Sequence, residues 1–239
     1  MTDAEHFSIA YGEMHLDYAV VRRARKTLEI AVEPDTSVVV AAPLDSTPDA
    51  IAAKVRKRAA WIIRQQRFFA QFMPRLPARQ YVAGETHRYL GRQYRLKVVP
   101  HVQQIVKMTR GYIVVQTHHP LSTEVTKDLV EAWYRQKAQA KFIERIDANL
   151  PRFPDGDARR PKGLIVRHMK QRWGSMSPGA RLMLNRRLIE APLDAIDYVI
   201  THELCHVTEA NHGRAFYDLL AKVMPDWERR KLRLERAMA

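Results

Sequence analysis

The sequence predicts an α+β fold in two parts, a β-rich N-terminal region with one long helix over residues 1–120 and a second region over residues 121–239. Two observations support this prediction. Most short runs that alternate between hydrophobic and polar residues lie before residue 120, and helical spacing of hydrophobic residues dominates after it. Extended patterns followed by helical ones are typical of α+β proteins.

The first part contains two predicted hairpins and one predicted helix. Residues 27–43 alternate, turn at Pro34-Asp35 and continue as a second strand, and residues 85–99 alternate on both sides of Gly91. The stretch "YIVVQT" (112–117) is expected to continue the second sheet. Between the hairpins, a helix is predicted to begin after Ser46 or Thr47. Its apolar positions recur at helical spacing and are Ile51, Val55, Ala59, Ile62 and Phe69.

The second part begins with a predicted helix over residues 121–150. The stretch "LPRFPDGDARRPKG" (150–163), rich in proline, glycine and charge, resembles a linker. Two short strands, "LIVRHM" and "RLMLNRRLI", are expected to flank the loop "KQRWGSMSPGA". A further helix begins near Pro192, with an apolar stripe of Ile196, Val199, Ile200 and Leu204, and two more helical segments follow.

Composition limits the location and the partners. No stretch approaches the roughly 18 apolar residues of a membrane helix, and the N-terminal residues do not have the pattern of a secretory signal. A single cysteine, Cys205, excludes an internal disulfide and fits a reducing compartment. We therefore expect a cytoplasmic protein without a membrane partner.

The net charge is +14, from 40 basic and 26 acidic residues. The basic residues gather at 21–26, 54–58, 157–163 and 227–236. Such patches fit a nucleic-acid or acidic-protein partner, but they also fit solvated faces of several helices.

The stretch "THELCHVTEANHGRAF" (201–216) contains an H-E-x-x-H pattern. His202 and His206 lie four residues apart and share one face of a helix, so their imidazoles can converge on one ion. Glu203 occupies the position of a general base for a metal-activated water. Zinc is the expected ion, although imidazoles suit several transition metals.

The third ligand is predicted to be His212 rather than Glu209. On an unbroken helix Glu209 would lie about 10 Å along the axis from His202, which is too far for one ion. His212 can approach only if the helix ends first, and Asn211 and Gly213 tolerate the left-handed geometry that ends helices. The metzincins share this histidine spacing but have glycine where this chain has Glu209, so we do not assign it to them.

Several stretches together resemble the YgjP-like zinc metallopeptidases, which are relatives of the SprT-like group: "KQRWGSMS", "LMLNRRLIEAPLDAIDYVITHELCH", "NHGRAFYDLL" and "MPDWERRKLRL", with "KTLEIAVEPDTSVVVAAP", "WIIRQQRFF" and "YLGRQYRLKVV" in the N-terminal part. The resemblance implies a zincin-like, minigluzincin-type region at 121–239, with a short sheet packed on the helices that flank the metal. By match, His202, His206 and His212 would be the ligands and Glu203 the base. The chain departs from the family at Met176, where cysteine is usual, and at Arg186, where tryptophan is common.

Three further residues are candidates for transition-state or supporting roles, namely Arg172, Asn185 and Tyr217. Arg172 could stabilise an oxyanion, Asn185 could hydrogen-bond near the site, and Tyr217 could donate to the transition state. Ordinary packing or surface roles are the alternative for each of them, and Cys205 is expected to be a small packed residue.

The sequence thus predicts a zinc metallopeptidase that acts on a protein or peptide substrate. The competing interpretation is a basic nucleic-acid-associated binding protein with a structural or vestigial metal site. Glu203 argues against that interpretation, because a structural site needs no general base.

Overall fold

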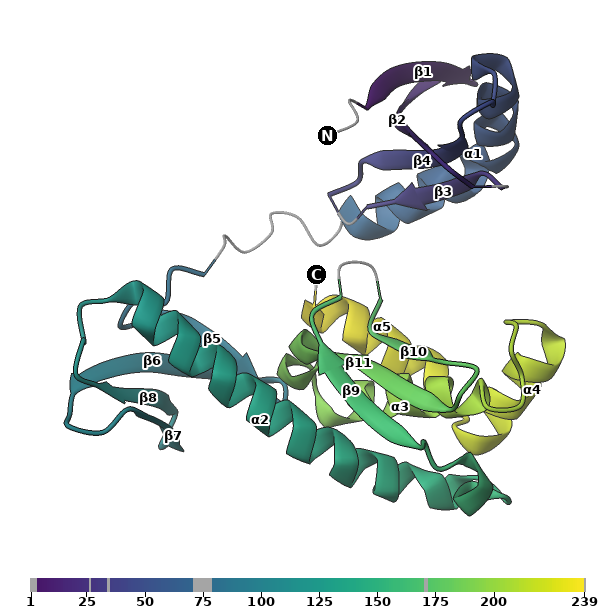
Figure 1. Ribbon diagram of the computed structural model, residues 1–239. Coiled ribbons are helices and arrows are strands. Elements are labelled where there is room, and N and C mark those ends of the chain that lie inside the picture. The colour runs from purple at the N-terminus through teal and green to yellow at the C-terminus, as the bar shows by residue number, and fades with distance from the viewer. Residues whose placement is uncertain (1–3, 26, 34, 71–78, 170–171, 239) are drawn as a thin grey trace. The chain divides into compact units, whose positions relative to one another are not determined.

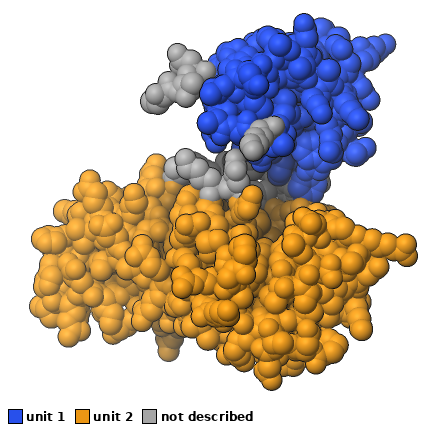
Figure 2. Space-filling view, turned by 45° about the vertical axis from the view of Figure 1, so that its right-hand side comes forward, with its two compact units in different colours: residues 1–76, 239 blue, residues 77–238 orange. Residues whose placement is uncertain are grey.

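The computed structural model describes residues 4–25, 27–33, 35–70, 79–169 and 172–238, and the chain divides into two compact units. Unit 1 comprises residues 1–76 with residue 239, and unit 2 comprises residues 77–238 (Figures 1 and 2). The mixture of sheets and helices confirms the α+β fold class. The division at residue 76 differs from the boundary after residue 120 that the sequence patterns indicated.

Unit 1 is a four-stranded sheet with one helix. Its strands β1 (Glu5–Tyr11), β2 (Met14–Arg23), β3 (Glu29–Val32) and β4 (Val38–Pro43) lie in the order β1-β2-β4-β3, and helix α1 spans Pro48–Ala70. Strands β3 and β4 form the predicted antiparallel hairpin, whereas β1 and β2 were not foreseen. Four of the five predicted apolar positions of α1 are buried and pack with strand residues such as Val20, Val38 and Val40.

Unit 2 begins with the second four-stranded sheet. Strands β5 (Thr86–Tyr89), β6 (Arg92–Pro100), β7 (Ile105–Thr109) and β8 (Tyr112–Thr117) are ordered β5-β6-β8-β7, and α2 (Thr123–Asn149) packs on one face of the sheet. Leu96 and Ile113 of this sheet share one hydrophobic core with Trp133 of α2 and with Leu182 farther along the chain. This shared core explains why the sheet belongs with the C-terminal elements rather than with unit 1.

The turn between β5 and β6 adds a second connection. The amide groups of Leu90 and Gly91 donate to the carbonyl oxygens of Ile189 and Glu190 at 2.9 and 3.0 Å. Gly91 has φ +77°, and a Cβ there would lie 2.9 Å from Pro192 Cγ. Glycine is therefore needed both for the turn and for its close approach to Pro192.

The remainder of unit 2 holds a three-stranded sheet and three helices. Strands β9 (Gly163–Arg167), β10 (Gly174–Met176) and β11 (Arg181–Asn185) are ordered β10-β11-β9, and helices α3 (Leu193–Cys205), α4 (Arg214–Val223) and α5 (Trp227–Met238) follow. Strand β10 lies inside the stretch that the sequence patterns assigned to a loop. It is too short for hydrophobic alternation to reveal it.

The stretch 150–163 is not a linker between parts of the chain. It contains the 3₁₀ segments Leu150–Arg152 and Gly156–Arg159, and Phe153 and Arg159 are buried. The Arg159 guanidinium lies 4.8 Å from the centre of the Phe153 ring and donates to the carbonyl oxygen of Leu204 and to Thr208 Oγ1. Arg159 is thus a buried charged residue of this stretch, and it binds the end of α3.

Candidate metal centre

Helix α3 carries His202 and Glu203 and ends at Cys205, so that His206 is its C-terminal cap. The predicted apolar stripe is buried: Ile196, Val199, Ile200 and Leu204. Asp197 joins α3 to α2, because its carboxylate accepts from Arg145 Nε and Nη2 at 2.7 and 2.8 Å and from Asn149 Nδ2 at 2.9 Å. A helix enclosed and bonded in this way has little freedom to rotate, which holds His202 in place.

The chain turns back immediately after α3. The amides of His206, Val207 and Thr208 donate to carbonyl oxygens three residues earlier, which closes the helix with 3₁₀-type bonds. Neither Asn211 nor Gly213 has a positive φ, and Gly213 has φ −85°. The predicted left-handed termination at these residues is therefore wrong, because the 3₁₀-type bonds end the helix before it reaches them.

Phe216, on α4, supports the three histidines from one side. Its ring is fully buried, with its centre 4.8 Å from that of His202 and 4.7 Å from those of His206 and His212. Because Phe216 contacts all three rings, it fixes the position of His212, in the loop 207–213, relative to the end of α3. Phe216 is therefore a packing residue whose contacts position the histidine rings.

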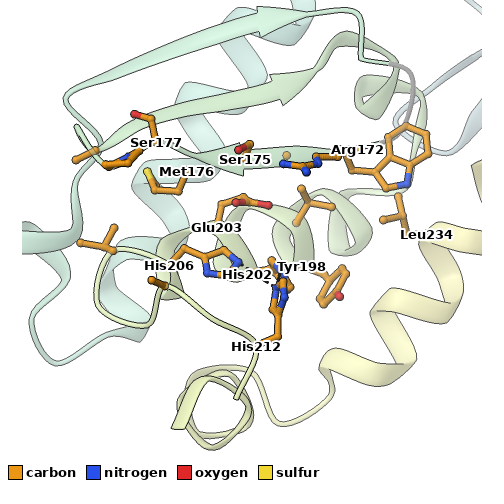
Figure 3. Close-up of a pocket in the computed structure, with 17 residues that line it drawn as sticks. Arg172, Ser175, Met176, Ser177, Tyr198, His202, Glu203, His206, His212 and Leu234 are labelled. Atoms are coloured by element: carbon orange, nitrogen blue, oxygen red, sulfur yellow. Dashed lines mark hydrogen bonds between the residues drawn. The ribbon is translucent and has the colours of Figure 1, made fainter. Parts of the chain in front are cut away.

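The three imidazoles converge through their Nε2 atoms (Figure 3). His212 Nε2 lies 2.9 Å from His202 Nε2 and 3.1 Å from His206 Nε2, and a ligand atom from each of the three lies within 4.8 Å of the others. Nitrogens bonded at about 2.05 Å to one tetrahedral ion would be about 3.3 Å apart. The donor set and its spacing therefore fit a transition-metal ion such as zinc.

The protonation states favour metal binding. Burial, reinforced by the neighbouring imidazoles and Lys231, lowers the pKa of His202 to about 3, and burial with His206 also lowers the pKa of His212. His206 Nδ1 lies 2.8 Å from the carbonyl oxygen of Glu209, which can only accept, so Nδ1 is a donor and Nε2 is the atom that faces the other two histidines. Neutral imidazoles with free Nε2 lone pairs are the form that binds metals.

Glu203 lies between the histidines and strand β10 (Figure 3). Its side chain is 6% exposed, and this burial raises its pKa to about 7, against the opposing effects of the Met176 amide and the Arg172 charge. A Cβ at Gly174 would lie 2.7 Å from Glu203 Cγ and 2.8 Å from Oε1. Glycine in β10 thus leaves the space in which the carboxylate is held.

A cavity of about 830 Å³ opens over these groups. Glu203 and all three histidines line it, together with β10 and the residues that flank this strand. Strand β10 is at the edge of its sheet, next to β11. The site therefore combines a convergent set of nitrogen donors, a buried carboxylate and a half-buried edge strand within one cavity.

A family model for the YgjP-like metallopeptidase domain matches residues 26–237. The chain belongs to the YgjP-like family. No curated protein and no solved structure is significantly similar to it. Membership of this family implies a metal and a peptidase type of site, which agrees with the donor set described above.

The two departures from the YgjP-like pattern have different surroundings. Met176 lines the cavity, so a change there alters the wall that faces a substrate. Arg186 is remote from the histidines, because its guanidinium pairs with Glu131 at 3.0 Å and stacks 5.5 Å from the centre of the Tyr134 ring. It belongs to the contacts between α2 and the segment that follows β11.

The three predicted supporting residues are placed differently. Arg172 is exposed at the cavity. Asn185 does not line the cavity; its Nδ2 donates to the carbonyl oxygens of Met169 and Arg172 at 2.7 and 3.0 Å and so holds the segment that carries Arg172. Tyr217 also lies outside the cavity lining, with its ring centre 6.4 Å from that of His212.

Tyr198 and Ser175 were not singled out by sequence reasoning, and both line the cavity together with Trp173. Tyr198 lies one turn before His202, with ring centres 5.8 Å apart, and its spacing on the helix could have revealed it. Cys205 is fully buried and burial raises its pKa to about 12, which agrees with the packed role expected for it. Within the described residues, no helix has the length and apolar composition to cross a membrane.

Proposed function

We propose that the chain is a zinc-dependent peptidase in which His202, His206 and His212 hold the ion and Glu203 is the general base. The observation that carries this proposal is the buried Glu203 carboxylate beside three convergent Nε2 atoms in an open cavity. Zinc bound there would supply a Lewis acid that polarises a carbonyl group and acidifies water.

Glu203 accounts for the proton transfers. A pKa raised to about 7 by burial suits a group that accepts a proton from the attacking water and then gives it to the leaving amine. The cation would stabilise the ionised carboxylate and so favour its action as a base at neutral pH. Gly174 and the amide of Met176 hold the carboxylate against β10, so that it points at one place in the cavity.

Strand β10 offers a means of holding the substrate. Its free edge lies along the cavity, and an extended peptide can pair with such an edge through main-chain hydrogen bonds. Main-chain pairing depends little on the side chains of the substrate. We therefore expect the substrate to be a protein or peptide that presents an unfolded or extended segment. The exposed Arg172 at the cavity is positioned to stabilise negative charge that develops during the reaction.

The test compares the wild type with Glu203→Gln at equal zinc content, measured by elemental analysis, on an unfolded protein substrate. We expect fragments from the wild type and a loss of at least about a hundredfold in the variant. Glu209→Gln is the matched control, because it removes the same charge near the site while the contact to His206 comes from the backbone of Glu209. If neither the wild type nor Glu203→Gln cleaved the substrate with zinc bound, this result would contradict the proposal and favour the binding-protein interpretation.

A further inference from the structure

Helix α1 carries a concentration of positive charge that the proposed metal centre does not use. Six cationic side chains on it are exposed: Lys54, Arg56, Lys57, Arg58, Arg64 and Arg67. The acidic residue of this helix, Asp49, lies in its first turn, before the cations begin. At 1.5 Å per residue the six charges occupy about 20 Å of helix.

The charges of α1 differ from those of α5, the other strongly basic helix. On α5, Arg229 and Arg230 bind Asp226, Lys231 pairs with Glu235, and Arg233 binds Asp194. By contrast, none of the six cations of α1 forms an ion pair or a hydrogen bond with any residue that the structure describes. Four of the five basic residues of α5 thus belong to an ordinary charge-balanced surface, with Arg236 as the exception, whereas none of the six on α1 does.

The spacing on α1 adds repulsion to this imbalance. Lys54 lies three residues before Lys57 and four before Arg58, and Arg64 lies three before Arg67, so like charges are neighbours on the helix surface. The helix tolerates the repulsion because its opposite face is anchored in the core of unit 1 by four buried residues, Ile51, Val55, Ala59 and Ile62. A polyanion bound along the helix would remove the repulsion by replacing it with attraction.

The chemistry of this face selects among polyanionic partners. The exposed positions between the cations include Ala53 and Ala60, whereas the large apolar residues of α1 are buried or half-buried, with Phe68 and Phe69 half-buried near its end. A helix that lies in a membrane surface exposes large apolar residues, and a protein interface needs apolar or aromatic anchors. Nucleic-acid interfaces are polar and strongly positive, and small alanines let a phosphate backbone approach closely.

We propose that α1 is a sequence-independent docking site for the phosphate backbone of a nucleic acid. The six cations would contact phosphates, which recur along the backbone whatever the base sequence. This function is separate from peptide hydrolysis, since it depends on unit 1 and not on the metal-centre residues.

The test measures binding of the full-length protein to a fluorescent 20-base-pair duplex of mixed sequence between 50 and 200 mM KCl, with a 20-nucleotide single strand as a parallel arm. The variant K54Q/K57Q/R58Q should weaken binding at least about tenfold at 100 mM KCl and flatten the salt slope by about 2.7, from three lost phosphate contacts. The variant K54R/K57R/R58K keeps the charges and should bind as the wild type does.

R229Q/R233Q/R236Q on α5 is the matched control, because it removes the same total charge from exposed positions. It should change the affinity less than threefold, and thermal melting should show that all variants remain folded. Equal weakening by the α1 and α5 variants would mean that only bulk charge matters and would overturn the proposal. Failure of the wild type to bind either nucleic acid at 50 mM KCl, including the case in which it binds phosphatidylglycerol vesicles instead, would overturn it too.

Discussion

Gly174→Ala should separate the position of Glu203 from the presence of the metal. The new Cβ would lie 2.7 Å from Glu203 Cγ, 2.8 Å from Oε1 and 3.0 Å from Cδ, all well inside ordinary contact distance. A contact at about 3.5 Å or more requires the carboxylate to move by up to about 0.8 Å or the strand to shift. Either response costs about 1–3 kcal/mol of stability, as overpacking usually does.

The effect on activity should exceed the effect on stability. A displacement approaching 1 Å at a reacting group can reduce the rate about a hundredfold, whereas the proposed ligands His202, His206 and His212 are untouched. We therefore expect Gly174→Ala to bind zinc with the wild-type stoichiometry and to lose about a hundredfold in kcat/KM on an unfolded protein substrate. Elemental analysis, thermal melting and initial rates measure the three quantities.

Gly179→Ala supplies the control in the same β10–β11 connection. A Cβ there meets Ser177 Oγ at 3.9 Å, which is ordinary contact, so activity and melting temperature should stay close to the wild type. Wild-type activity in Gly174→Ala, with the alanine confirmed and zinc bound, would refute the reasoning that the glycine holds the base in position.

Three other changes test the supports of the site. Arg159→Met removes donors to the carbonyl oxygen of Leu204 and to Thr208. It should lower the free energy of unfolding by about 2 kcal/mol, measured by denaturant unfolding, and weaken zinc binding, measured by metal titration. Asn185→Ala leaves two carbonyl oxygens without their donor, so it should lower the free energy of unfolding by about 1–3 kcal/mol and reduce activity. A substitution of a residue with only a surface role would change neither quantity. In metal-free protein the raised pKa of Glu203 means that the folded state binds more protons than the unfolded state between pH 4.5 and about 7. The contribution of Glu203 to the free energy of unfolding is therefore present at low pH and is lost as the pH rises through this window. Relative to the wild type, Glu203→Gln should therefore gain up to about 3 kcal/mol of stability across that window in pH-dependent chemical denaturation, and a constant difference would contradict the raised pKa.

Local spacing made the centre of the site predictable. His202 and His206 are four residues apart on a strongly apolar helix, and helical geometry alone brings them to one face. The exclusion of Glu209 also rested on helix geometry, and in the structure this residue contributes its backbone carbonyl to His206 rather than its carboxylate. The way in which the chain reaches His212 was not predictable, because it depends on Phe216 packing among the three rings.

The division into units shows the limit of patterns along the chain. Strands β5 to β8 have the same alternation as the strands of unit 1, so their periodicity could not indicate which helix covers them. Residues 150–163 have the composition of a linker, yet Arg159 is buried where it binds the end of α3. Composition reports average solvation, and it does not report the particular partners, here Asp155, the Leu204 carbonyl oxygen and Thr208, that make burial of a charge favourable.

By itself, the sequence determined the class of fold, the helix of the H-E-x-x-H pattern, the two histidines on its face and the surplus of positive charge. Each of these follows from residue type and from regular backbone repeats, which act over a few residues. Only the tertiary structure decided that Gly174 makes room for Glu203, that Tyr198 faces the cavity, that Arg159 and Asn185 support the site, and that the cations of α1 have no ion-pair partner among the described residues. Those features depend on contacts between residues far apart in the chain, and packing in three dimensions alone establishes them.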